Sequence, residues 1–147
     1  MNERVETLFL IDSNILIYGY DNTDKRKHEI AKKLLSKCWK KEVPYIISTQ
    51  NLAEFFVIVT KKIPNPISIE KAECIINDII AFSHWHVISY NQSTLQKAIS
   101  LYKEEKKHFW DVLIIATMQQ NSILHIYTEN TKDFALYKNV FVVNPFD

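Results

Sequence analysis

Short apolar runs alternate with longer amphipathic segments along this 147-residue chain, and this alternation limits the possible folds more than any other feature. Several of the runs are apolar at successive positions instead of at every second one, which suits strands that are covered on both faces of a sheet. Strands are therefore predicted at Leu8–Ile11, Tyr45–Ile47, His86–Ser89, Leu124–Thr128 and Val140–Val143.

The segments between these runs have helical periodicity or helix-start signals. Helices are predicted at Asn14–Tyr20, Asp24–Lys40, Asn51–Lys61, from the cap Ser68 onward, at Ser93–Lys107 and at Asp111–Gln120. Strands separated by helices form right-handed βα units around a parallel sheet. We therefore predict an α/β fold with a three-layer α/β/α architecture and about five parallel strands, in one domain spanning residues 1–147.

Two helices, not one, separate the second predicted strand from the third. If the first helix travels outward from the sheet, the second must return. The turn at Ile63–Ser68 is then the tip of a protruding helical arm, which we interpret as a candidate element for dimerisation or substrate capture.

The composition excludes several ways of binding phosphate. Gly19 is the only glycine, so no glycine-rich phosphate loop is present. The formal net charge of +1 does not indicate a strongly basic nucleic-acid binder. Basic residues cluster at 25–27, 61–62 and 106–107, and each cluster is most simply a solvated surface. Phosphate binding would have to depend on a local patch or on a metal ion.

Cys38 and Cys74 match no metal-ligand or redox spacing, and both are expected to pack in helices. No apolar run approaches the roughly 20 residues that span a bilayer. The start of the chain is polar and carries no apolar signal region. We expect a cytoplasmic protein without a membrane segment.

Acidic residues from distant segments are predicted to meet at one edge of the sheet, the edge where ligands bind in open α/β folds. Asp12 follows the first strand, and Glu54 lies early in the helix after the second strand. Asp111 opens a helix that feeds the strand at Leu124, and Asp133 follows that strand together with Glu129 and Asn130. This convergence is the strongest functional signal in the sequence.

Each acid also has an ordinary structural interpretation. Asp12 could be a helix N-cap, and Asp111 could be placed by the helix dipole alone. Glu54 could be solvated, and Asp133 could belong to a plain turn. Together, however, clustered carboxylates repel one another and need a cation to stay ionised. Oxygen ligands favour Mg²⁺ or Mn²⁺, and two such ions about 4 Å apart can cleave a phosphodiester.

Several motifs resemble those of PIN domains. The segments that carry the resemblance are Phe9–Asn14, Asn51–Phe55, Phe109–Thr117, Tyr127–Phe134 and Val143–Phe146. They cover about Leu8–Phe146 in consistent order. The resemblance implies a metal-dependent ribonuclease acting on RNA, often the VapC-type toxin of a toxin–antitoxin pair.

The resemblance also implies roles for individual residues. Metal ligands would be Asp12, Glu54 and Asp111, with Asp133 as the fourth acid, and neighbouring positions would be Asn14, Thr128 and Asn130. Asn130 stands where many relatives carry Asp. The implied cofactor is Mg²⁺ or Mn²⁺, and the implied partners are an antitoxin and a second copy in a homodimer.

Alternatives remain open at this point. A haloacid-dehalogenase-like phosphatase needs a second acid two residues after the first, where this chain has Asn14. A receiver-type signalling domain needs paired acids after its first strand, and only Asp12 is present there. A non-catalytic RNA-binding or scaffold PIN-like domain is the remaining alternative, and the presence of Asp12, Glu54 and Asp111 argues against it.

Overall fold

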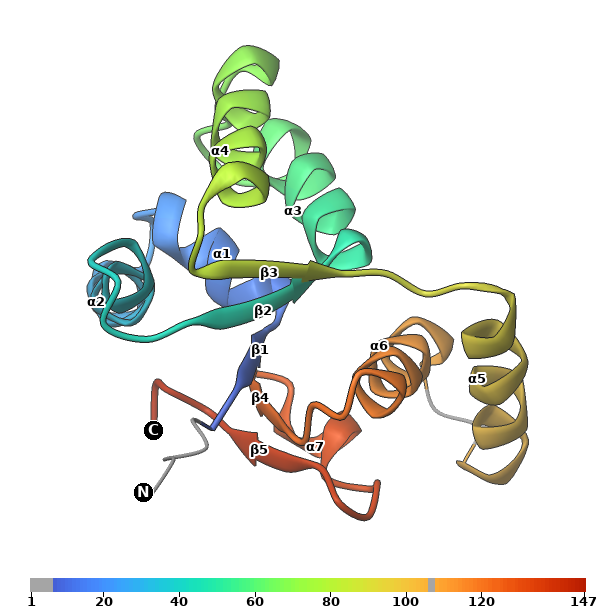
Figure 1. The fold of residues 1–147 in the computed structure, drawn as a ribbon. Coiled ribbons are helices and arrows are strands. Elements are labelled where there is room, and N and C mark those ends of the chain that lie inside the picture. Colours follow the sequence, from blue (N-terminus) through green and yellow to red (C-terminus); the bar gives the residue numbers. More distant parts are fainter. Residues whose placement is uncertain (1–6, 106–107) are drawn as a thin grey trace, which may run out of the picture.

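The computed structural model describes residues 7–105 and 108–147 and contains one five-stranded sheet (Figure 1). All neighbouring strands are parallel and follow the order β3-β2-β1-β4-β5. The strands are β1 (Phe9–Ile11), β2 (Tyr45–Ser48), β3 (Trp85–Ile88), β4 (His125–Tyr127) and β5 (Phe141–Val143). The predicted α/β fold with a parallel sheet of about five strands is confirmed.

Helices flank this sheet and connect its strands. They are α1 (Ser13–Tyr20), α2 (Lys25–Trp39), α3 (Thr49–Lys61), α4 (Ile69–Ala81), α5 (Gln92–Glu105), α6 (Phe109–Gln120) and α7 (Thr131–Phe134). The predicted helices are confirmed with small shifts of their ends. The predicted end of α5 and the basic pair at 106–107 lie outside the described residues. Within the described ranges, none of the helices has both the length and the apolar character needed to cross a membrane.

Two apolar cores lie on opposite faces of the sheet, because neighbouring residues of a strand point to opposite sides. Ile11 and Ile47 pack into the core formed with α1 to α4. Leu10 and Ile46, one residue earlier in the same strands, pack into the core formed with α5 to α7. Helix α6 is buried at every position from 112 to 118. This double coverage explains why the inner strands are apolar throughout.

The edge strand β5 departs from this expectation. Phe141 is 56% exposed and Val143 is 39% exposed. The prediction that an apolar run is covered on both faces is therefore wrong for β5, which pairs only with β4. The prediction for the cysteines is confirmed for Cys38, which is buried, and wrong for Cys74, which is exposed on α4.

Gly19 marks a close contact between α1 and α2. A Cβ atom at this position would lie 2.5 Å from Cδ1 of Leu35. Glycine inside a helix costs about 1 kcal/mol relative to alanine, so its presence here reflects the close packing of the two helices.

Helices α3 and α4 form the predicted arm, an antiparallel pair that projects from the end of the molecule where β2 and β3 lie (Figure 1). At the tip, the amide of Ile67 donates to the carbonyl of Val59 over 2.9 Å. Ser68 caps α4 by accepting a hydrogen bond from the amide of Lys71 at 3.1 Å. The function of the arm stays a prediction.

The cap at Ser68 predicts a measurable loss of stability. Ser68→Ala should lower the free energy of unfolding by about 1 kcal/mol, because the amide of Lys71 loses its partner. Urea denaturation measures this change. Ser100→Ala, at an exposed position inside α5, is the matched control and should cause no loss. An equal effect of both changes would contradict a specific capping role.

The strand order also defines where a ligand site belongs. From β1 the chain adds β2 and β3 on one side, and later β4 and β5 on the other. The order therefore reverses between β1 and β4, and open α/β sheets bind ligands beyond the carboxyl ends of strands at such a point. Asp12 directly follows β1, and Thr128 directly follows β4.

Candidate active site

Asp12 is the buried centre of the polar residues at this edge, with 5% of its surface exposed. Its Oδ1 accepts from the amide of Ser13 at 2.8 Å and from Nδ2 of Asn51 at 3.1 Å. Its Oδ2 accepts from the Thr128 hydroxyl at 2.7 Å and from Nδ2 of Asn14 at 3.3 Å. Asp12 is thus the N-cap of α1, which was one of the two interpretations of this residue. It also joins its own segment to those that contain Asn51 and Thr128.

The other predicted neighbours surround this carboxylate. Nδ2 of Asn14 also lies 3.3 Å from the hydroxyl oxygen of Thr128, and Oδ1 of Asn14 accepts from the amide of Glu129 at 3.2 Å. Asn130 contributes its backbone amide, which donates to the Thr128 hydroxyl oxygen at 3.0 Å, while the residue itself is exposed. Asn14 and Thr128 therefore contact Asp12 directly, and Asn130 supports Thr128.

Asn51 is fully buried and was not predicted as a site residue. Besides Asp12, its Nδ2 donates to the Ser13 hydroxyl oxygen at 3.1 Å. Its Oδ1 accepts from both the amide and the hydroxyl of Ser48, at 3.1 and 2.6 Å. The sequence signal was the capping box that Ser48 and Asn51 form at the start of α3. Asn51 therefore connects the start of α3 to Asp12.

Glu54 is half-buried one turn further along α3, and each of its oxygens has a protein donor. The Ser13 hydroxyl donates to Oε2 at 2.6 Å, and Nε2 of Gln50 donates to Oε1 at 3.0 Å. The same Nε2 donates to the carbonyl of Trp110 at 2.9 Å. Ser13 thus places Glu54 near Asp12, and Gln50 connects it to the start of α6. Neither Ser13 nor Gln50 was predicted.

Asp111 lies in the first turn of α6 but does not open the helix as predicted. The helix begins at Phe109, and His108 is the N-cap without a side-chain hydrogen bond. Burial raises the pKa of Asp111 to about 6; the negative charges of Asp133 and Glu54 add to this rise, and His108 opposes it. Asp111 therefore interacts electrostatically with two of the other predicted acids.

The pKa of Asp12 is also raised, from 3.8 to about 6, chiefly by burial. Hydrogen bonds from Thr128 and Ser13 oppose this rise, and the charges of Asp111 and Glu54 add to it. Each of the four predicted acids therefore affects, or is affected by, the charge of at least one other: Asp111 and Glu54 act on Asp12, and Asp133 and Glu54 act on Asp111. Asp133, in the short helix α7, takes part through Asp111.

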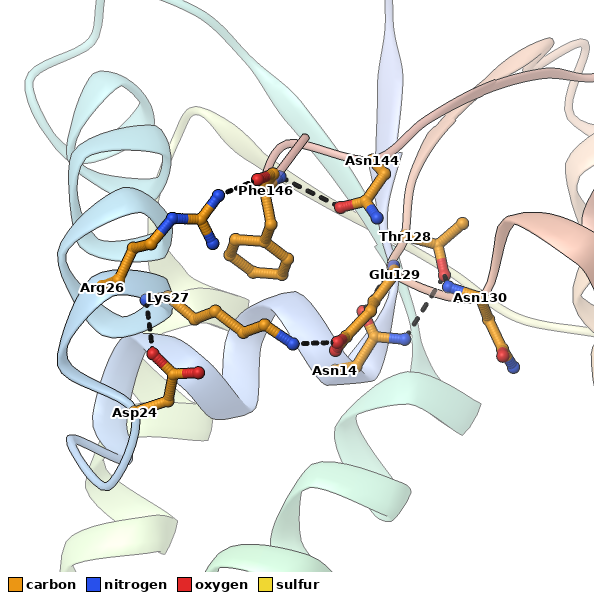
Figure 2. Close-up of polar contacts among 9 residues, drawn as sticks. All are labelled: Asn14, Asp24, Arg26, Lys27, Thr128, Glu129, Asn130, Asn144 and Phe146. Atoms are coloured by element: carbon orange, nitrogen blue, oxygen red, sulfur yellow. Dashed lines mark hydrogen bonds and ion pairs between the residues drawn. The ribbon is translucent and has the colours of Figure 1, made fainter.

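A fifth acid nearby, Glu129, has its own cation (Figure 2). Lys27, at the start of α2, forms an ion pair with Glu129. The Lys27 ammonium also lies over the rings of Tyr18 and Phe146, 5.2 and 5.6 Å from their centroids. Arg26 donates to the carbonyl of Phe146. The start of α2 therefore holds both the loop after β4 and the last residues of the chain.

The four predicted acids differ from Glu129, since none forms an ion pair within the described residues. Their oxygens, with nearby hydroxyl and amide oxygens, are the hard ligands that suit Mg²⁺ or Mn²⁺. In the side-chain conformations described, no three His, Cys, Asp or Glu residues are grouped so as to hold a metal. The ligand chemistry fits a hard divalent cation, and binding one would require these side chains to close together.

The hydrogen bonds of Asn51 predict a loss of stability when this side chain is removed. Asn51→Ala should lower the free energy of unfolding by about 1–3 kcal/mol, because buried donors and acceptors lose their partners. Urea denaturation tests this. Asn77→Ala, at an exposed position on α4, is the control with little expected change. Equal stability of the Asn51 variant and the unmodified protein would exclude a structural role for Asn51.

Comparison with solved structures supports the same architecture. VapC20 of Mycobacterium tuberculosis, described as a toxin that cleaves the sarcin–ricin loop, superposes with a TM-score of 0.66 at 17% identity, covering 87% of this chain and 94% of that chain. A toxin–antitoxin complex from Klebsiella pneumoniae gives a TM-score of 0.62 at 27% identity, covering 93% and 97%. VapBC2 of Rickettsia felis, bound to promoter DNA, gives 0.62 at 18%, covering 93% and 98%.

Comparison of the sequence with curated proteins gives no match. The sequence model of the PIN domain matches residues 9–139, which include β1 to β4, α1 to α7 and every predicted acid, and end before β5. The match extends over most of the chain, and the solved structures compared above share its fold. The chain therefore belongs to the PIN-domain family.

Proposed function

We propose that this protein is a metal-dependent endoribonuclease that hydrolyses RNA phosphodiester bonds with Mg²⁺ or Mn²⁺. The observation that carries the proposal is the placement of Asp12, Glu54 and Asp111 at one edge of the sheet. Asn51 and Ser13 connect Asp12 to Glu54, and Gln50 connects Glu54 to the start of α6. None of the three acids forms a salt bridge in the described part of the chain. Membership of the PIN-domain family supports it.

The proposed roles follow from the contacts. Asp12, Glu54 and Asp111 would hold the metal, with Asp133 as the fourth acid. When bound, the metal supplies activation of water and stabilisation of negative charge on the phosphodiester. The chain's own polar residues hold these carboxylates in place: Asn14, Thr128 and Asn51 hold Asp12, whereas Ser13 and Gln50 hold Glu54.

We also propose that the protein is the toxin of a cytoplasmic toxin–antitoxin pair and forms a homodimer. Support comes from the Klebsiella pneumoniae toxin–antitoxin complex, which is 27% identical and is covered over nearly its full length.

The neighbouring gene tests the assignment as a toxin, because a short reading frame for a DNA-binding protein should lie beside the gene of this protein. Light scattering after size-exclusion chromatography tests the homodimer and should give twice the mass of the 17.3 kDa chain.

An RNA cleavage assay with controlled metal content tests the nuclease proposal. Cleavage should stop in EDTA and return with excess Mg²⁺ or Mn²⁺, leaving 5′-phosphate and 3′-hydroxyl ends. Activity that persists in the chelator would remove the metal mechanism. Absence of cleavage with either ion, on single-stranded and structured RNA alike, would favour the non-catalytic scaffold.

A further inference from the structure

A groove with a volume of about 370 Å³ follows one side of α3, with Gln50 and Glu54 at the end nearest the candidate active site. Ala53, Val57 and Ile58 line it along the helix, and Trp110 of α6 lines it from across. Lys62, the C-cap residue of α3, lies at its far end. At 1.5 Å per residue, the Cα atoms of Glu54 and Lys62 are about 12 Å apart along the helix axis. The groove is thus continuous with the candidate active site and as large as a small-ligand pocket.

Trp110 lines this groove and is exposed to solvent. It is 61% exposed, although it directly precedes Asp111 and the buried part of α6. One contact involves its backbone and one its side chain. Its carbonyl accepts from Nε2 of Gln50 on α3, and its indole packs edge-on against the ring of Phe109, with centroids 5.9 Å apart. A large aromatic side chain is therefore exposed to solvent beside a proposed metal ligand.

The charges at the two ends favour one kind of occupant. In the proposed function the Glu54 end carries a divalent cation, and Lys62 is a cation at the other end. Two positive ends separated by an apolar wall fit an aromatic base between two phosphates. Nucleobases stack on exposed aromatic side chains in proteins that bind single-stranded RNA. The apolar middle supplies no backbone partners of the kind that an extended peptide uses.

We propose that this groove is a subsite for one unstacked nucleobase of single-stranded RNA next to the cleaved phosphodiester, with Trp110 as the stacking surface and Lys62 as a phosphate contact. The proposal rests on the ribonuclease function proposed above. A base inside a duplex is already stacked and does not reach the groove. Single-stranded RNA or an RNA loop should therefore be preferred to duplex RNA.

Binding of a short single-stranded RNA that carries 2-aminopurine tests the stacking contact. The measurement uses the full chain with Ca²⁺ in place of Mg²⁺, so that binding is read without cleavage. Trp110→Ala should weaken binding about tenfold and abolish the quenching of 2-aminopurine fluorescence, whereas Trp110→Phe should retain part of both effects. Phe141→Ala removes a similarly exposed aromatic residue from β5, outside the groove lining, and should change neither.

The salt dependence of the same binding tests Lys62. Lys62→Ala should reduce the slope of log affinity against log salt by about one, because one phosphate contact is lost. Lys37→Ala, at an exposed position in the last turn of α2, is the matched control and should leave the slope unchanged. Equal slopes for the Lys62 variant and the unmodified protein would overturn the phosphate contact.

The outcomes separate this inference from the nuclease proposal. If Trp110→Ala changes neither the binding of single-stranded RNA nor the KM for cleavage, the subsite is overturned even if the protein cuts RNA. That result would favour a protein segment as the occupant of the groove. Binding that depends on Trp110, in a protein that cuts no RNA with any ion, would support the subsite and reject the nuclease. Equal binding of duplex and single-stranded RNA would also overturn the assignment.

Discussion

Asp12→Asn should lower the rate of RNA cleavage at least about a hundredfold without unfolding the protein. Asparagine keeps one oxygen in place but removes the negative charge that a divalent cation needs. The amide nitrogen that replaces Oδ2 cannot accept the hydrogen bonds that Thr128 and Asn14 donate to this oxygen. The hydrogen bonds that Ser13 and Asn51 donate to Oδ1 are retained, so the variant should fold with reduced stability while the proposed metal binding is lost.

Single-turnover cleavage and calorimetric titration with Mn²⁺ measure this effect. Asp78→Asn, the same chemical change at an exposed position on α4, is the matched control and should keep full activity. Circular dichroism should show that both variants are folded. Cleavage by the Asp12 variant at the rate of the unmodified protein would indicate that the activity comes from a contaminant or from a different site.

The metal-free protein should lose stability as the pH rises from about 4 to about 6. The pKa of Asp12 is about 6 in the folded protein and 3.8 as an ordinary carboxyl group. Between these values the folded state binds more protons than the unfolded state, so the free energy of unfolding falls as pH rises. The favourable contribution is complete below the lower pKa and lost above the higher one. For Asp12 the shift corresponds to about 3 kcal/mol.

Urea denaturation in EDTA at a series of pH values measures this curve. The difference between the unmodified protein and Asp12→Asn isolates the contribution of Asp12 from that of other titrating groups. Mg²⁺ or Mn²⁺ should raise the melting temperature most at pH 7 and least near pH 4.5, because protons compete with the metal for the carboxylates. A difference curve that rises with pH through this window would contradict the raised pKa.

Local sequence patterns were enough to predict the strands, the arm and the edge of the sheet near which the acids lie. Asp12 and Glu54 could be placed because their distance from the end of a strand fixes the edge of the sheet to which they belong. Asp111 was placed at the correct edge but at the wrong helix position, because Phe109 and Trp110 are not helix-start signals. The four-residue helix α7 is too short to show a periodicity.

The contacts around the acids could not be predicted, since they depend on how helices approach one another. The capping box of Ser48 and Asn51 is visible in the sequence, but nothing local indicates that the same amide reaches Asp12, 39 residues earlier. Lys27 and Glu129 are 102 residues apart and meet only because β4 is inserted beside β1. The exposure of Phe141 follows from the place of β5 at the sheet edge, which an apolar run does not encode.

The division of the interior into two cores has a consequence for the mechanics of the molecule. Glu54 belongs to a helix that packs in one core, and Asp111 and Asp133 belong to helices of the other. Asp12 directly follows β1, a strand that contributes residues to both cores. A cation shared by these carboxylates would connect the helices on one face of the sheet to the helices on the other face. Without it, these two layers are joined mainly through the short strands between them. Binding of the cation would reduce the motion of the two helical layers relative to each other, and its release would increase that motion.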